Sequence, residues 1–431
     1  MLINTAVLSV VKLENTDIRI DDLAEPVLTE MQQGALDYGK TLQVELSVDA
    51  VLKAAVQQTG FSDFGADDFK ERLAVQLQSA DEDPWTNQLG KFTVFNEKVL
   101  NAASRLRVMD YLKQHPEVDD IEIEKPLIIV GLPRSGTTHL VNLIAADQRF
   151  RSMPYFESRQ PVPSPGENGS RDENDPRFQR TAQAWAMQDA LLPLLKNMHA
   201  MTPQHIHEEI ELQDLDFSSY TLEWIANVPR WRDYYLAHDQ TPHYQFLKRM
   251  LKVLRHQAGP DQWILKSPQH LEQLLPLHSV FPDATVAITH RDPVAVITSA
   301  VTMLAYGSRM RNPVMRLPEL ADYWIDRVER LLRSCLRDLD KLPASQTIDV
   351  LFPEFMADDM AMVRRVYETA GIDMTAEAQA QLQAYLDANP RGKHGQILYD
   401  LEGDFGVKPE SLYDRFDFYY QRYPLLDPRK Q

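Results

Sequence analysis

The sequence predicts an α/β protein in which a parallel sheet is flanked by helices. Short, continuous apolar runs rich in β-branched residues recur after residue 125, as is typical of strands that are buried on both faces of a sheet. Helical patterns separate these runs. Strands that alternate with helices form parallel sheets with crossover helices.

The 431 residues allow two domains, or one large domain with an added subdomain. We expect a helical N-terminal extension over 1–124, followed by an α/β domain over 125–431. Within that domain, helical periodicity predicts an insertion at about 178–258. We place a separate C-terminal segment at about 388–431.

Periodicity and composition place the individual elements along the chain. Apolar residues at three-to-four spacing predict helices in the extension over 29–39, 50–59 and 92–115. Continuous apolar runs predict strands at 126–130, 263–265, 284–289 and 347–351. Helical patterns between and after them cover 269–280, 293–304, 318–341 and 357–371. A polar, proline- and glycine-rich loop is predicted over 161–176.

Charge and cysteine content exclude several classes of protein. With 45 Lys and Arg against 63 Asp and Glu, the net charge of −18 argues against a nucleic-acid coat protein. A single cysteine, Cys335, permits no intrachain disulfide or cysteine zinc site and fits a reducing compartment. The first residues lack the basic segment of a signal peptide, and no stretch of about 20 apolar residues occurs. We therefore expect a cytoplasmic protein without a membrane span.

The segment Gly131-Leu-Pro-Arg-Ser-Gly-Thr-Thr138 lies between a predicted strand and a predicted helix. Backbone N–H groups and a helix N-terminus converge in such a loop and bind phosphate. The segment nearly matches the nucleoside-triphosphatase P-loop, G-x-x-x-x-G-K-[ST], but Thr137 replaces the lysine that reaches the terminal phosphates. This argues against ATP hydrolysis, and Arg134 supplies a cation instead. The alternative is an ordinary strand–turn–helix corner.

Two further segments end predicted strands with polar side chains. Lys266 ends one strand and His270 follows four residues later; ligands of open α/β sheets bind beyond such carboxyl ends. Arg291 ends the next strand, and Ser299 lies eight residues on, two turns along the predicted helix. Arg291 and Ser299 could grip one anionic group together. The alternative for Lys266 and His270 is a solvated strand end and an ordinary helix residue.

Together these motifs resemble the PAPS-dependent sulfotransferases. The loop at 133–138 is similar to the family's 5′-phosphosulfate loop, and Arg291 with Ser299 is similar to its 3′-phosphate motif. Lys266 and His270 resemble the Lys-x-His of cytosolic members, with two extra residues between them.

The resemblance extends beyond these motifs. The stretch FPDATVAITHRDPVAVITS is similar to bacterial members, as is the tail that begins Arg391-Gly-Lys-His-Gly395. The similarity covers roughly 125–425, and 1–124 also looks like the helical extension of the bacterial group.

The resemblance implies that 3′-phosphoadenosine 5′-phosphosulfate (PAPS) is the sulfuryl donor. The 5′-phosphate and sulfate oxygens would contact Arg134 and the loop residues Ser135, Gly136, Thr137 and Thr138. The 3′-phosphate would contact Arg291 and Ser299, with Arg391 and Lys393 closing over the nucleotide. Lys266 would stabilise charge on the leaving phosphate. Because a sulfuryl group carries less charge than a phosphoryl group, no metal is expected in the reaction.

A general base must take the proton of the acceptor hydroxyl, which a small molecule, a lipid or a sugar could provide. We expect His270 to be that base, because imidazole titrates near pH ~6.5, with Glu157 as the second choice. Two alternatives to a sulfotransferase stay open. One is a P-loop kinase of a small molecule, and the other is a non-catalytic nucleotide-binding protein.

Two clusters in the predicted insertion have both a functional and a structural interpretation. His205 and Glu209 would share a helix face and could hold a metal ion, although such runs are more often a helix face or a pocket wall. The aromatic residues of 217–246 would line either the core or a lipophilic acceptor pocket.

Overall fold

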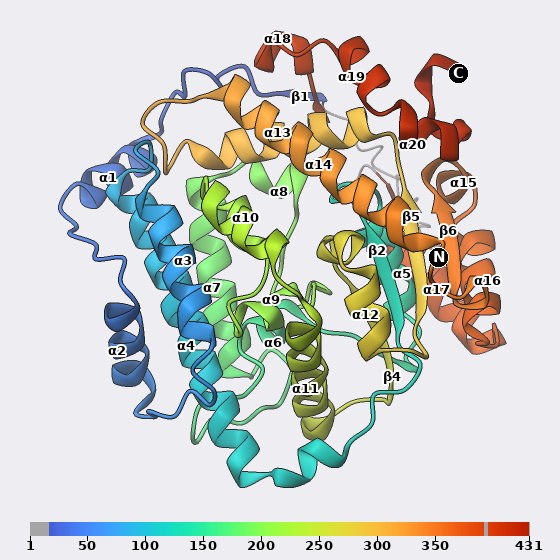
Figure 1. The fold of residues 1–431 in the computed structure, drawn as a ribbon, viewed down its shortest axis with the longest axis horizontal. Helices are drawn as coiled ribbons and strands as arrows, with labels where there is room; N and C mark the ends of the chain where they lie inside the picture. The colour runs from blue at the N-terminus through green and yellow to red at the C-terminus, as the bar shows by residue number, and fades with distance from the viewer. Residues whose placement is uncertain (1–16, 392–394, 431) are drawn as a thin grey trace, which may run out of the picture.

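The computed structural model describes residues 17–391 and 395–430. Five strands form one parallel sheet in the order β3-β4-β2-β5-β6, shown in Figure 1, which confirms the predicted fold class. The strands are β2 (Leu127–Gly131), β3 (Phe150–Arg151), β4 (Gln262–Lys266), β5 (Thr285–His290) and β6 (Thr347–Leu351). The four predicted strands are present, and the two-residue edge strand β3 is additional.

The central strand β2 shows why a continuous apolar run suits this position. Every residue of β2 is buried, and alternate side chains join different hydrophobic clusters on the two faces of the sheet. Ile128 and Val130 belong to the larger cluster, while Leu127 and Ile129 belong to the other. A strand with apolar neighbours on both faces cannot alternate apolar with polar residues.

Helices cover both faces of the sheet. The larger cluster contains residues of α11 (Thr241–Gln257), α12 (Leu274–Val280), α13 (Pro293–Ser308) and α14 (Leu317–Leu339). The smaller cluster contains residues of α5 (Thr137–Ala145), α15 (Phe352–Ala357), α16 (Asp359–Ala370) and α17 (Ala376–Ala388). Between strands and helices lie the short turns η3 (Pro268–Glu272) and η4 (Ala344–Gln346).

The N-terminal region is helical, as predicted. It contains α1 (Glu30–Gly39), α2 (Val48–Thr59), α3 (Phe69–Asp81), α4 (Gln88–Gln114) and the turn η1 (Pro116–Asp120). These helices pack onto later parts of the chain, because Arg72 and Arg105 each lie 2.9 Å from the Asp216 carboxylate. Figure 1 shows α3 beside α10, with which it is in contact. A domain boundary at 124/125 stays a prediction.

The segment between β3 and β4 is mainly helical, as predicted for 178–258. It contains α6 (Tyr155–Arg159), α7 (Pro176–Leu191), α8 (Leu195–Met198), α9 (Ile210–Asp214), η2 (Thr221–Trp224), α10 (Pro229–Ala237) and α11. Its aromatic residues mostly fill the core, since Phe217, Tyr220, Trp231, Tyr235 and Tyr244 are all buried. Trp224 is different: with Trp85, Tyr323 and Trp324 it lines a cavity of about 120 Å³.

Residues 205–208 do not form the helix that was considered for His205 and Glu209. Ile206 forms an isolated antiparallel bridge with Pro154, so His205 and Glu209 do not share a helix face.

The C-terminal segment returns to the start of the described chain. β7 (Gln396–Leu398) pairs in parallel with β1 (Asp17–Arg19), and Arg19 forms a bidentate ion pair with Asp404. The chain ends with α18 (Leu401–Phe405), α19 (Pro409–Arg415), α20 (Asp417–Arg422), η5 (Pro424–Leu426) and η6 (Pro428–Lys430). None of the helices in the described part of the chain is long and apolar enough to cross a membrane.

Candidate active site

The strand order marks one place in the sheet where a ligand pocket is expected. From central β2 the chain first builds the β3 and β4 side and then crosses to β5 and β6 on the other side. Ligands of open α/β sheets bind at such a switch point, outside the carboxyl ends of the strands. The loop between β2 and α5 starts there.

The loop has the tight backbone that its two glycines predict. Gly136 has φ 93° and is the residue before α5, while Gly131 leaves no room for a side chain, because a Cβ there would lie 1.9 Å from the Thr289 hydroxyl oxygen. The Ser135 hydroxyl donates to the Leu132 carbonyl at 2.5 Å and lies 2.7 Å from that of Thr289. Ser135 and Thr137 are buried, so these side chains stabilise the loop itself.

The first turn of α5 has no side-chain cap. Its N–H groups therefore keep the positive end of the helix available for an anion.

Arg134 and Arg291 meet beside Ser299. The Arg134 side chain donates to the Ser299 hydroxyl at 3.1 Å, and Arg291 donates to the Arg134 carbonyl at 2.6 Å. The Arg291 guanidinium also lies over the Phe352 ring, 4.3 Å from its centre. Arg134 holds a left-handed backbone, φ 69°, which is strained for a residue with a side chain.

Neither guanidinium has a carboxylate partner among the described residues. Burial, followed by the positive charge of Arg134, lowers the pKa of Arg291. Two neighbouring cations without an ion-pair partner favour the approach of an anion.

Lys266 ends β4 next to the loop. Its side chain is 1% exposed, and its ammonium lies 3.5 Å from the Thr138 hydroxyl and 2.5 Å from a Glu208 oxygen. The Glu208 side chain is 20% exposed, which leaves part of this carboxylate open. The predicted position of Lys266 beside the loop is therefore what the structure shows.

His270 does not present a free ring nitrogen beside Lys266. Its Nδ1 lies 2.6 Å from the Tyr244 hydroxyl, its Nε2 lies 2.6 Å from Glu209, and its side chain is fully buried. The other oxygen of Glu209 accepts from the backbone N–H of Lys266 at 2.8 Å. His270 thus contacts the carboxylate that binds the backbone at the end of β4. Because both of its ring nitrogens are engaged within the protein, this geometry does not suit the role of general base that we expected for His270.

Glu157 is also engaged within the protein. This buried carboxylate lies 2.9 Å from Arg151 and 2.5 Å from Arg171. A proton acceptor must reach the acceptor hydroxyl, and Glu157 instead balances two guanidinium groups. Both expected bases are buried, whereas the Glu208 side chain is 20% exposed.

The C-terminal segment reaches the site through Tyr399, which the sequence did not single out. Its hydroxyl lies 3.1 Å from that of Ser299. Arg391, expected to close over the nucleotide, binds the Met356 carbonyl and Asp359, each at 2.7 Å. Lys393 lies outside the described residues.

Three histidines of the insertion lie close to one another. The ring centres of His199 and His205 are 5.9 Å apart, as are those of His205 and His207. Burial lowers the pKa of His205 to about 3, and it lowers that of His199 well below its usual value, with the charges of His205 and Arg134 adding to the effect. These two rings are therefore neutral at neutral pH.

Fold and site together give an α/β protein with two neighbouring arginines and an uncapped helix N-terminus at the carboxyl edge of its sheet. In a comparison with protein families, residues 126–376 match the one described as "Sulfotransferase family", which covers more than half of the chain. The protein belongs to the sulfotransferase family and is an enzyme of that family.

Solved structures agree with this assignment. The chain is 25% identical to sulfotransferase STF1 from Mycobacterium tuberculosis H37Rv, with a TM-score of 0.76 over 86% of this chain and 98% of that one. It is also 25% identical to sulfotransferase STF9 from Mycobacterium avium, with a TM-score of 0.77 over 88% and 97% of the two chains. A search of curated proteins finds no match.

Proposed function

We propose that this enzyme transfers the sulfuryl group from PAPS to a hydroxyl group of a small-molecule, lipid or sugar acceptor. The observation that carries the proposal is the pair of side chains Arg134 and Arg291. Arg291 donates to the backbone carbonyl of Arg134, and neither guanidinium has a carboxylate ion-pair partner among the described residues. PAPS carries anionic groups at both its 5′ and 3′ positions, so it needs two cationic contacts within the length of one nucleotide.

The residues present fit this donor. The uncapped N-terminus of α5 and Arg134 would hold the 5′-phosphate and sulfate oxygens, together with the backbone amides of Gly136, Thr137 and Thr138. Arg291 and Ser299 would hold the 3′-phosphate, and the Tyr399 hydroxyl adds a contact to Ser299. ATP fits less well, because buried Thr137 takes the position of the P-loop lysine.

Lys266 and Glu208 form the reactive pair in this proposal. Lys266 stabilises the negative charge that develops on the leaving phosphate oxygen as its bond to sulfur breaks. Glu208 accepts the proton of the acceptor hydroxyl as that oxygen bonds to sulfur. In the described structure the two groups neutralise each other at 2.5 Å. Movement of the ammonium toward the donor would free the carboxylate to act as the base.

The remaining predicted residues receive supporting roles. His270 is a positioning residue, because it acts on Lys266 through Glu209. Glu157 balances Arg151 and Arg171. Arg391 anchors the C-terminal segment to α15 and α16. A cytoplasmic location stays a prediction.

The proposal is tested by single-turnover transfer from radiolabelled PAPS to a panel of phenols, sterols, lipid alcohols and sugars. We expect Glu208→Gln to lower the transfer rate by roughly 10²–10⁴-fold while it still binds adenosine 3′,5′-bisphosphate. Exposed Glu410 on α19 provides a matched control, and Glu410→Gln should keep the full rate.

Two further outcomes would test the assignment of Glu208 as the base separately from the proposed enzymatic function. Full activity of Glu208→Gln would remove the base assignment, and a loss in a His199→Asn variant would then move it to that imidazole. Tight nucleotide binding by the unaltered protein without transfer to any acceptor would instead favour the non-catalytic alternative.

A further inference from the structure

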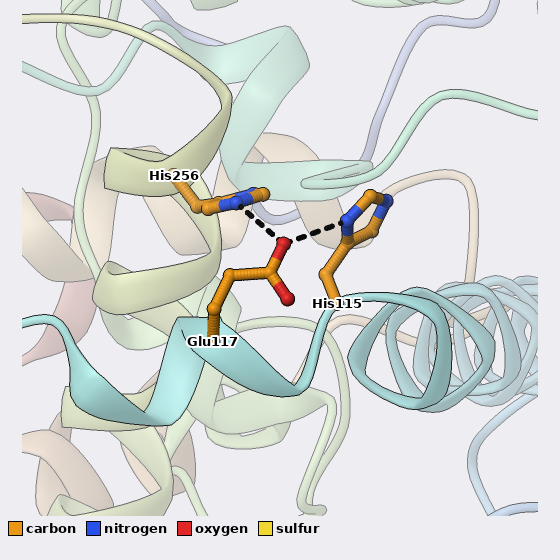
Figure 2. Close-up of side chains that lie close together, drawn as sticks. All are labelled: His115, Glu117 and His256. Atoms are coloured by element: carbon orange, nitrogen blue, oxygen red, sulfur yellow. Dashed lines mark hydrogen bonds and ion pairs between the residues drawn. The ribbon is translucent and has the colours of Figure 1, made fainter.

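Two imidazole rings and one carboxylate meet at a corner that the reaction does not use. Figure 2 shows the carboxylate of Glu117 between His115 and His256. His115 Nδ1 and His256 Nε2 each lie 3.2 Å from Glu117 Oε1, and all three donor atoms lie within 4.8 Å of one another. Tetrahedral zinc with bonds of about 2.0–2.1 Å places its ligand atoms about 3.3 Å apart. We propose that this cluster is a zinc-binding site.

The backbone around the cluster favours a cation. His115 directly follows the last residue of the 27-residue helix α4, and His256 is the second-last residue of α11. The C-terminal end of a helix carries partial negative charge from its unpaired carbonyl groups. Two helix ends and one carboxylate therefore converge on the same point.

Tyr111 prepares the imidazoles for binding. Its hydroxyl lies 2.7 Å from His256 Nδ1, and its ring centre lies 4.4 Å from that of His115. A histidine that binds metal through Nε2 keeps its proton on Nδ1 and donates it to a neighbour. Tyr111 supplies that acceptor and restricts the rotation of both rings.

Nearby cations do not compete for Glu117. On α11, Arg249 pairs with Asp119 and Arg255 pairs with Asp261, while Lys252 donates to the Asp119 carbonyl. On α4, Lys113 pairs with Asp63. Among the described residues, the ion-pair partners of Glu117 are the two histidines alone.

The cluster lies at the N-terminal ends of the strands, away from the candidate active site. The turn η1 precedes β2 and the helix α11 precedes β4, so both segments lie at the N-terminal ends of these parallel strands. Lys266 ends β4 at the opposite edge, where the donor pocket lies. A zinc ion here would link the corner of α4 and η1 to the end of α11, and water would fill the remaining coordination position.

Zinc titration of the full-length protein, free of any polyhistidine tag, tests the site at pH 7.5. We expect one Zn²⁺ per chain at saturation and a rise of a few degrees in the melting temperature at about 100 times the dissociation constant. Co²⁺ should bind in its place with the visible absorption of a tetrahedral complex. His115→Ala and His256→Ala should abolish both effects.

Two further variants make the test specific. His278→Ala removes a half-buried histidine on α12 outside the cluster and should leave zinc binding unchanged. Tyr111→Phe should weaken binding by roughly 10–100-fold, because it removes the acceptor of the Nδ1 proton. Lack of stoichiometric binding, or binding that survives both cluster variants, would overturn the proposal.

Discussion

The Arg134 side chain donates a hydrogen bond to the Ser299 hydroxyl across 165 residues of sequence. This contact joins the loop after β2 to the second turn of α13. In the sequence, these two segments are related only because each resembles a motif of the same family. It brings the side chain expected to hold the 5′-phosphate next to the hydroxyl expected to hold the 3′-phosphate.

The first prediction concerns the tight approach at Gly131. Gly131→Ala should lower the free energy of unfolding by about 1–3 kcal/mol, because its Cβ would overlap the Thr289 hydroxyl and force the loop apart. Gly34 of α1 is the matched control, since nothing lies within 4 Å of a Cβ there. Gly34→Ala should raise stability by about 0.5–1 kcal/mol. Urea unfolding of both variants measures the contrast, and equal effects would contradict it.

The second prediction separates binding from chemistry at Lys266. Lys266→Met should lower the rate of sulfuryl transfer by roughly 10²–10³-fold, because charge on the leaving oxygen loses its cation. Affinity for adenosine 3′,5′-bisphosphate, measured by calorimetry, should change only a few-fold. Exposed Lys40→Ala should change neither quantity. A collapse of nucleotide affinity in Lys266→Met would show that this lysine binds the donor rather than assisting its reaction.

The third prediction concerns pH and the buried carboxyl of Asp214. Burial raises its pKa to about 6, above the ordinary value of about 3.9. The folded state therefore holds an extra proton between pH 4 and 6, and the stability due to this group is lost as the pH rises through that window. The Ser219 hydroxyl donates to this carboxylate.

Asp214→Asn tests this dependence. Relative to the unaltered protein, the variant should gain stability as the pH rises from 4 to 6, by at most about 3 kcal/mol. The difference in free energy of unfolding, followed by urea titration at several pH values, reports this one group. A difference that stays flat would contradict the raised pKa.

The sequence predicted the sheet and the loop because their signals are local. A buried strand needs an unbroken apolar run such as 127–130. The residue before α5 has a left-handed backbone, φ 93°, which favours a glycine such as Gly136. The fold class, the four longer strands of the sheet and the position of Lys266 beside the loop follow from such patterns.

Long-range partners were beyond the reach of local patterns. Glu209, 61 residues before His270, lies 2.6 Å from the Nε2 atom of that fully buried imidazole. Tyr399 reaches Ser299 from 100 residues away. His115 and His256 come together only because α4 and α11 end at the same corner. His270 was predicted as the general base from its own segment, which holds no signal for these distant contacts.

The central claim is that Arg134 and Arg291 bind opposite ends of one doubly phosphorylated adenosine. Calorimetry of adenosine 3′,5′-bisphosphate and adenosine 5′-monophosphate with the unaltered protein and with Ser299→Ala and Arg291→Ala tests it most directly. The account predicts that the bisphosphate binds at least about 100-fold tighter, since a phosphate held by hydrogen-bonded arginine contributes several kcal/mol. That preference should shrink in Ser299→Ala and vanish in Arg291→Ala. Equal affinity of the unaltered protein for the two nucleotides, or a preference that survives in Arg291→Ala, would contradict it.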